Sequence, residues 1–212
     1  MAWCVSELDR GFLAGFLEGE ACVTIAELNG GQSYSCRMGL RARDDDQDLL
    51  EWLVALTGLG RLARVPAQRT SRPQISWMID SQRDCTELQR LLASCGFHGR
   101  RAAELEIWSE AVEVWRRMGG DARRAALRTL KSRLEAARKY GSGATSARRF
   151  AGPDTQTLGY ISGLVCAEGC FQSNRSRPRF SMHMRHDERP LLELLRSTTG
   201  CGAIHDHDPG RR

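Results

Sequence analysis

ELDRGFLAGFLEGEACV, at residues 7–23, recurs in altered form as TQTLGYISGLVCAEGCF at residues 155–171. The two segments lie 148 residues apart, and each carries an acid near its end, Glu20 in the first and Glu168 in the second. The matched small residues are Gly11 with Gly159, Gly15 with Gly163, and Gly19 with Ala167. A segment that returns with the same spacing of small and acidic residues indicates an internal repeat.

A second pair of segments supports this repeat. Residues 37–60 match residues 179–202 at a separation of 142, so the loop before them is six residues longer in the first copy. Loops are where repeated units differ in length. The matched residues are Arg43 with Arg185, Asp45 with Asp187, Leu49-Leu50-Glu51 with Leu191-Leu192-Glu193, and Thr57-Gly58 with Thr199-Gly200. Two matched blocks in the same order predict two copies of one structural unit.

The small residues predict that the helices at the start of each copy pack against each other. They recur every four positions, which places them in one row along a helix face. Glycine costs a helix roughly 1 kcal/mol relative to alanine, so three in a row require a compensating contact. Close backbone contact between the two helices would supply it. The packing residues are then Gly11, Gly15, Gly19, Gly159, Gly163 and Ala167.

The pattern that follows each of these helices predicts an α+β unit. Met38 and Leu40 alternate with basic residues, and Phe180 and Met182 do the same in the second copy, which is typical of a strand with one buried face. The other expected elements of the first copy are a strand that runs into a polar, Pro-containing turn within 61–73, a strand at 74–79, and helices at 48–56, 84–94 and 101–115. The first unit is therefore expected to form a sheet with one face covered by helices and one exposed.

These elements divide the chain into a first unit at 6–117, a basic linker helix and loop at 118–153, and a partial second unit at 154–212. Residue 212 corresponds to Thr70 of the first copy, so the second unit is expected to lack counterparts of the strand at 74–79 and of the helices after it. The linker carries nine Lys and Arg residues between 121 and 149, against two acids. Such an excess suits a phosphate backbone, and a solvated helix is the alternative.

Composition indicates an ordinary globular protein. The chain has 212 residues, of which 27% are charged, and a formal net charge of +5. Its start does not resemble a signal peptide, and no run approaches the roughly 18 apolar residues that span a bilayer, so a cytoplasmic location is expected. The eight cysteines include no CxxC pair, which favours reduced thiols over disulfides or structural zinc.

LAGFLEGEA, at residues 13–21, resembles the nonapeptide that names the LAGLIDADG homing endonuclease family, and ISGLVCAEG, at 161–169, is a looser second copy. The resemblance implies pseudo-symmetric tandem αββαββα units whose saddle-shaped antiparallel sheets lie on double-stranded DNA. It also implies that the last acid of each motif, Glu20 and Glu168, binds a divalent metal, Mg²⁺ or Mn²⁺, and cleaves one strand. The backbone of the next residues, Ala21 and Gly169, would approach the metals.

The physical chemistry of helix ends agrees with this assignment. Glu20 and Glu168 stand at the C-terminal ends of their helices, where the helix dipole disfavours an acid. Bringing the two ends together adds repulsion between the carboxylates. Hard divalent cations would remove both penalties, and Mg²⁺ also suits phosphates. Such cations activate water and stabilise the leaving oxygen of a phosphodiester. The alternative is that each glutamate is a solvated helix-end acid.

Further catalytic candidates follow from the resemblance, because family enzymes keep basic or amide side chains around the water near the metals. Arg43 and Arg185 match across the repeat, and simple phosphate contacts are the alternative for both. One departure affects the second site, where Cys166 replaces the first acid of the motif, Glu18. A second group of basic candidates is His98, Arg100 and Arg101.

Sequence readout is expected from the polar faces of the strands, where Arg pairs with guanine and Asn or Gln with adenine in the major groove. The candidates are Thr24, Arg37, Arg41, Gln74 and Ser76 in the first copy and Gln172, Asn174, Arg179 and His183 in the second. The expected function is a monomeric site-specific double-strand DNA endonuclease, with a homodimer through the first unit as the alternative assembly. The alternative function is a catalytically impaired relic that acts as a DNA-binding protein or RNA maturase.

Overall fold

The computed structural model describes residues 5–67, 72–140, 154–174 and 177–206. The first unit contains α1 (Glu7–Glu20), β1 (Cys22–Leu28), β2 (Ser33–Arg43), α2 (Gln47–Thr57), β3 (Arg61–Val65), β4 (Gln74–Ile79), α3 (Gln82–Leu92), α4 (Ala102–Arg117) and α5 (Gly120–Tyr140). The second contains α6 (Thr155–Glu168), β5 (Gly169–Asn174), β6 (Arg177–Met182) and α7 (Arg189–Thr199). Short 3₁₀ turns lie at Asn29–Gly31, Asp44–Asp46 and His186–Glu188. This order confirms the predicted repeat of a helix–strand–strand–helix unit.

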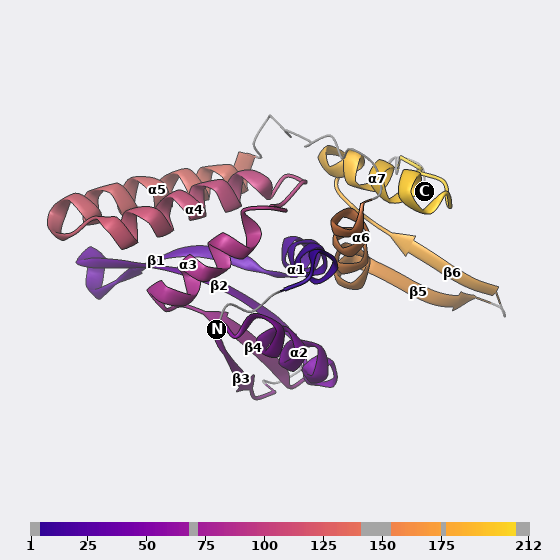
Figure 1. Cartoon of the computed structure of the whole chain (residues 1–212), viewed down its shortest axis with the longest axis horizontal. Helices are drawn as coiled ribbons and strands as arrows, with labels where there is room; N and C mark the ends of the chain where they lie inside the picture. Colours follow the sequence, from indigo (N-terminus) through magenta and orange to yellow (C-terminus); the bar gives the residue numbers. More distant parts are fainter. Residues whose placement is uncertain (1–4, 68–71, 141–153, 175–176, 207–212) are drawn as a thin grey trace.

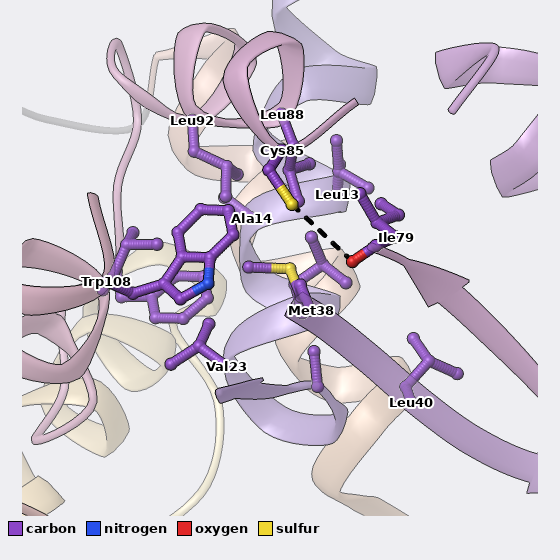
Figure 2. Packing of buried hydrophobic residues seen from close by; sticks show 14 of the residues in the cluster. Leu13, Ala14, Val23, Met38, Leu40, Ile79, Cys85, Leu88, Leu92 and Trp108 are labelled. Carbon is purple, nitrogen blue, oxygen red and sulfur yellow. Dashed lines mark hydrogen bonds between the residues drawn. The ribbon is translucent and has the colours of Figure 1, made fainter. Parts of the chain in front are cut away.

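The first unit is built on an antiparallel sheet with the strand order β1-β2-β4-β3. Alternation gives this sheet one apolar face, on which Val23, Met38 and Ile79 are each 1% exposed. Leu88 and Leu92 of α3 and Trp108 of α4 lie over this face, as Figure 2 shows. Among the elements that the structure describes, none of the helices lies on the opposite face (Figure 1), in agreement with the predicted half-covered sheet.

Helix α5 belongs to the core of the first unit, although the sequence indicated only a basic linker. Its residues Leu127, Leu130 and Leu134 are buried, and the helix packs against α4 and β1 (Figure 1). Many of its cations are engaged within the protein. Three of them form ion pairs with acids: Lys131 with Glu27 and Glu135, Arg133 with Glu110, and Arg138 with Glu104. Arg124 donates hydrogen bonds to Gln32 and Asp121, and Arg128 donates one to the Tyr34 hydroxyl. These contacts favour a structural role for the charge run.

The central contact of the molecule is between α1 and α6, which lie side by side (Figure 1). They run in the same direction, because Gly11, Gly15 and Gly19 meet successively later residues of α6. A Cβ added at Gly15 would lie 2.0 Å from the carbonyl oxygen of Tyr160, and one at Gly163 would lie 2.1 Å from that of Phe12. Gly11 and Gly159 meet the opposite backbone at similar distances, and Gly19 faces Ala167. The predicted row of small residues is therefore the contact surface between the two units.

Local hydrogen bonds repeat between the copies and confirm the second matched block. The Thr57 hydroxyl donates to the Leu53 carbonyl at 2.8 Å, and Thr199 does the same to Leu195 at 2.8 Å. The glycines that follow, Gly58 and Gly200, both adopt positive φ, which ends α2 and α7 in the same way.

In the second unit, β5 and β6 form a two-stranded antiparallel sheet beside α7 (Figure 1). These elements match β1, β2 and α2. In the part of the chain that the structure describes, no strand pairs with the second edge of β6, the edge that corresponds to the side of β2 that binds β4. No described helix combines the length and apolarity needed to cross a bilayer.

Candidate active site

Glu20 and Glu168 are the last residues of α1 and α6, and the contact between these helices brings them together. At each end the chain turns at once from helix to strand, because the following residues, Ala21 and Gly169, have extended backbone. The Glu168 carboxylate lies over the last turn of α1, since its Oε1 is 3.5 Å from the position that a Cβ on Gly19 would occupy. Both glutamate side chains are exposed. The predicted pair of acids therefore forms one site.

The electrostatics of Glu20 show the cost of this arrangement. Partial burial raises the pKa of the Glu20 carboxyl, and the nearby charges of Glu168 and Asp46 raise it further. The guanidinium of Arg101 acts in the opposite direction. A cation between the two carboxylates would offset the burial and the repulsion together.

The donor set fits Mg²⁺ or Mn²⁺ better than zinc. Within the described ranges, no cluster of three or more His, Cys, Asp or Glu side chains is arranged to hold a metal. A cation here would therefore have two carboxylates, Glu20 and Glu168, and would take its remaining oxygens from water, backbone or substrate. Mg²⁺ is commonly held in this way, by one or two carboxylates together with waters and phosphate oxygens.

The strand residues that the sequence predicted in the first unit share the open face of the sheet. Thr24 lies opposite Arg37 in the β1–β2 pair, and Arg41 lies opposite Ser76 in the β2–β4 pair. A hollow of about 350 Å³ on this face is lined by Glu20 together with Thr24, Arg37, Arg41 and Ser76. Gln74 lies further along β4, opposite Arg43. The acid at the end of α1 thus opens onto the same surface as these polar side chains.

The second unit repeats this layout on its two strands. Gln172 lies opposite Arg179, and Asn174 lies opposite Arg177. His183 follows β6 directly and matches Arg41 of the first copy. Cys22 pairs with Gly39, and Cys170 pairs with Ser181. Arg41 and His183 each lie two residues beyond these partners, and Glu20 and Glu168 each lie two residues before the cysteines, so the antiparallel register places Arg41 near Glu20 and His183 near Glu168.

Arg43 and Arg185, which the repeat matched, are engaged locally instead. Arg43 pairs with Asp45, and Arg185 donates to Asp187 at 3.1 Å. Arg43 is the last residue of β2, whereas Arg185 follows the end of β6 at Met182, and each arginine directly precedes the 3₁₀ turn that holds its partner acid. The cation whose charge bears on Glu20 is Arg101. The ion pairs of the matched arginines are therefore with the turns, and their catalytic role stays a prediction.

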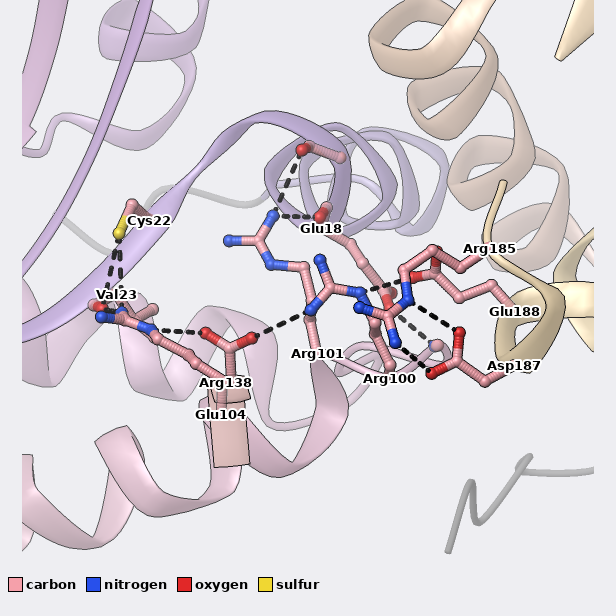
Figure 3. Close-up of polar contacts among 12 residues, drawn as sticks. Glu18, Cys22, Val23, Arg100, Arg101, Glu104, Arg138, Arg185, Asp187 and Glu188 are labelled. Atoms are coloured by element: carbon pink, nitrogen blue, oxygen red, sulfur yellow. Dashed lines mark hydrogen bonds and ion pairs between the residues drawn. The ribbon is translucent and has the colours of Figure 1, made fainter. Parts of the chain in front are cut away.

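Arg101 anchors the C-terminal end of α1. Its guanidinium donates to the backbone carbonyls of Glu18 and Gly19, the latter at 3.2 Å, as Figure 3 shows. These carbonyls are the negative end of the helix, where a cation is favourable. Next to it, Arg100 lies 3.6 Å from Glu188 of the second unit (Figure 3). The sequence indicated His98, Arg100 and Arg101 as a group of basic candidates, but it did not show which carbonyls or acids they contact.

Glu18 has a structural role that the sequence did not reveal. It is 3% exposed and accepts hydrogen bonds from the backbone N–H groups of His98, at 2.7 Å, and Gly99, at 2.6 Å. The Tyr160 hydroxyl of α6 donates to it at 2.5 Å. Glu18 therefore ties α1, the turn before α4, and the second unit together. Its counterpart, Cys166, is exposed.

Replacing Tyr160 with phenylalanine is expected to destabilise the protein more at pH 8 than at pH 5. Burial raises the pKa of Glu18 above its ordinary value of 4.5, so this carboxyl makes the free energy of unfolding fall as the pH rises through the raised pKa. Removing the hydroxyl raises the pKa further, because a donor to the carboxylate is lost. We expect a loss of about 1.5–3 kcal/mol at pH 8, measured by urea unfolding.

Tyr34→Phe is the matched control for this change. The Tyr34 hydroxyl is also in a buried residue, but it accepts a hydrogen bond from Arg128 at 3.3 Å, whereas the Tyr160 hydroxyl donates to a carboxylate. Its loss is expected to be small and equal at both pH values. An equal loss for Tyr160→Phe at pH 5 and pH 8 would show that the hydroxyl does not act through the Glu18 charge.

Comparison with known proteins gives a fold and no sequence family. No protein-family model and no curated protein matches the chain. Among solved structures, the LAGLIDADG meganuclease I-AabMI bound to uncleaved DNA has a TM-score of 0.70 and 18% identity, covering 94% of this chain and 75% of that one. I-SmaMI bound to an uncleaved DNA target with calcium ions has a TM-score of 0.71 and 16% identity, covering 95% and 76%.

A third structure gives the same result. The LAGLIDADG homing endonuclease I-GzeII in complex with its DNA target has a TM-score of 0.71 and 15% identity, covering 95% of this chain and 75% of that one. At these identities the likeness concerns the backbone, and it extends over both units. The chain therefore has the fold of the LAGLIDADG homing endonucleases, as the repeated motif predicted.

Proposed function

We propose that this protein is a site-specific double-strand DNA endonuclease that hydrolyses phosphodiester bonds with Mg²⁺ or Mn²⁺. The observation that carries the proposal is the meeting of Glu20 and Glu168 at the ends of α1 and α6, beside an open and basic sheet face. The solved structures with the same fold, described above, were determined with DNA bound.

The open sheet face suits the major groove of DNA. A β-ribbon enters that groove, where Arg recognises guanine and amide side chains recognise adenine. Arg37 and Arg41 of β2 lie on the open face. Thr24 of β1 lies opposite Arg37, and Ser76 of β4 lies opposite Arg41. In the second unit, Gln172, Arg179 and His183 would extend this contact surface.

The chain's own residues divide the catalytic work. Glu20 and Glu168 would hold the divalent cations, with the backbone of Ala21 and Gly169 alongside. The cations would supply an activated water and charge stabilisation at the phosphate. Arg101 holds the end of α1 and moderates the negative charge at Glu20. Arg41 and His183 stand level with the acids, where they would contact the phosphates on either side.

The reaction that this arrangement supports is in-line hydrolysis. The oxygen of a water molecule forms a bond to phosphorus while one P–O ester bond breaks. One proton of the water passes to the leaving oxygen, and the second is released to solvent. Two acids at one position would place two such events close together on opposite strands.

A cleavage selection tests the proposal. DNA duplexes with randomised sequence are first selected for binding in Ca²⁺, and the bound pool is then transferred to Mg²⁺. We expect cleavage of both strands at one position, and none in EDTA. Sequence-specific binding without cleavage in Mg²⁺ or Mn²⁺ would overturn the nuclease and leave a DNA-binding protein. Absence of specific binding would overturn both.

Arg101→Ala is expected to lower the cleavage rate about tenfold to a hundredfold with little change in DNA affinity. The guanidinium holds the last carbonyls of α1 and favours the ionised form of Glu20, so its loss misplaces the acid and raises its pKa. The pH profile of the cleavage rate should therefore shift to higher pH, which simple unfolding would not cause. Arg90→Ala, which removes an exposed arginine paired with Glu87, is the control. An unchanged pH profile would contradict this role.

A further inference from the structure

The junction between α1 and β1 carries Glu20 and passes from helix to strand within two residues. Glu20 ends α1 and Cys22 begins β1, while Ala21 between them has extended backbone and is 1% exposed. The final helical hydrogen bond runs from the Ala21 N–H to the Leu17 carbonyl at 2.9 Å. The last carbonyls of a helix have no partner within it. The position of the Glu20 side chain therefore depends on the groups that hold the backbone around it.

Two arginines from other elements hold this backbone on either side of Glu20. Arg101 donates to two carbonyls before it, and Arg138 of α5 donates to the Val23 carbonyl after it (Figure 3). The same guanidinium donates to the Cys22 sulfur at 3.5 Å. Because β1 is the edge strand of its sheet, side chains of α5, which packs against it, can reach its backbone. Glu20 thus lies between two points at which an arginine fixes the chain.

The orientation of Arg138 is set by Glu104 of α4. Glu104 is 5% exposed, and its Oε2 accepts from Arg138 Nε at 3.0 Å. Its other oxygen, Oε1, lies 3.7 Å from Arg100 Nη1. A buried carboxylate needs such cations beside it. A guanidinium is a planar fork of five donors, so Arg138 serves Glu104 through Nε and the Val23 carbonyl through Nη2 at the same time.

The same group of charges reaches the second unit. Arg100 Nε lies 3.6 Å from Oε1 of Glu188, which lies in the 3₁₀ turn before α7. Glu104 is therefore the shared partner of one arginine that holds β1 and one arginine that faces the second unit (Figure 3). Ion pairs thus connect the backbone beside Glu20 with the unit that carries Glu168.

Arg133 shows how Arg138 differs from a simple ion pair on the same helix. Arg133 also joins α5 to α4, through an ion pair with Glu110 at 2.8 Å, and both side chains are half exposed. Exposed pairs of this kind contribute little to stability. Arg138 reaches past its acid to a backbone carbonyl of β1. This second contact indicates a role beyond joining two helices.

We propose that Arg138, oriented by Glu104, is a positioning residue for the Glu20 carboxylate. Together with Arg101 it fixes the turn from α1 into β1 and so keeps Glu20 in one place. The proposal rests on the proposed nuclease function, because its consequence is a change in the cleavage rate. The contact of Arg138 with the Val23 carbonyl, called here the β1 clamp, can also be measured without cleavage. A misplacement of about 1 Å can lower a reaction rate about a hundredfold.

Arg138→Ala is expected to lower the cleavage rate about tenfold or more, with little change in DNA affinity measured in Ca²⁺. The rate is the single-turnover constant at saturating protein, on a duplex recovered from the binding selection. Arg133→Ala is the matched control, because it removes an arginine of α5 that pairs with a glutamate of α4 and should cleave at the original rate. Unequal rates with equal affinities separate positioning of the acid from binding of DNA.

Arg138→Lys keeps the fold testable if the alanine variant unfolds in the absence of urea. Lysine retains the positive charge beside Glu104, but a single ammonium cannot serve this acid and the Val23 carbonyl together. We expect its free energy of unfolding, measured in urea, to stay close to that of the original protein while its cleavage rate stays low.

Hydrogen exchange measures the β1 clamp without metal or DNA. The backbone amides of β1, Cys22–Leu28, should exchange faster in Arg138→Ala and in Arg138→Lys than in the original protein, and at an unchanged rate in Arg133→Ala. Unchanged exchange in both Arg138 variants would overturn the β1 clamp. Faster exchange with a full cleavage rate would overturn the positioning role. If the original protein binds DNA without cleaving it, the proposed function alone fails, and faster exchange still supports the β1 clamp.

Discussion

Replacing Glu20 with glutamine is expected to abolish DNA cleavage and to make the protein slightly more stable. Glutamine keeps the shape of the side chain but removes the charge that would hold a divalent cation, so the cleavage rate should fall by about a thousandfold or more. Removing an acid from the C-terminal end of α1 also removes repulsion by Glu168 and Asp46. Helix-end charges of this kind contribute about 0.3–1 kcal/mol.

Single-turnover cleavage and urea unfolding measure the two effects. DNA affinity in Ca²⁺ should be close to that of the original protein, because the sheet face is unaltered. Glu7→Gln is the control, since this acid lies at the opposite end of the same helix, in its first turn, where an acid is favourable. Glu20→Gln with full cleavage activity would exclude this carboxylate from the site.

Gly15→Ala is expected to separate the two units. The added Cβ would lie 2.0 Å from the carbonyl oxygen of Tyr160, which is backbone and cannot rotate away. Helices α1 and α6 must then move apart, which strains the contact between them and stretches the Tyr160–Glu18 hydrogen bond. We expect a loss of about 3 kcal/mol or more in the free energy of unfolding, against the usual gain from Gly→Ala in a helix.

Gly119→Ala is the matched control, because a Cβ at that position meets no atom within 4 Å. Chemical denaturation compares the two variants, and sensitivity to limited proteolysis between the units reports their separation. If Gly15→Ala unfolded at the same urea concentration as Gly119→Ala, the close contact of α1 with α6 would be wrong.

Features built from repeated side chains were predictable from the sequence. The glycine rows predicted the α1–α6 contact because close packing leaves few residue types that fit. The alternation around Met38 predicted the buried face of β2 because side chains on a strand point alternately to opposite sides. Around Phe180 it predicted the strand β6 correctly but its buried face wrongly, since Phe180 is 41% exposed. For the glycine rows and for β2 the constraint acts on the residue itself.

Features built from backbone partners or distant charges were not predictable. Glu18 accepts hydrogen bonds from the backbone N–H groups of His98 and Gly99. Almost every residue type has a backbone N–H group, so the sequence does not show which residues donate to a buried acid. Arg43 and Arg185 were matched correctly, but the match reflects the acids two positions later and says nothing about Glu20. The cations of α5 find acids on other elements, which a local charge count does not register.

The Tyr160–Glu18 hydrogen bond has a consequence for how the two halves recognise each other. Phe12 is the counterpart of Tyr160 in the first copy. Two first units joined by the same helix contact would therefore each place a ring without a hydroxyl next to the buried Glu18 carboxylate of the other. A single oxygen atom thus favours pairing of unlike halves over pairing of like halves. Because the two halves need not be identical, each is free to specialise its surface without altering the other.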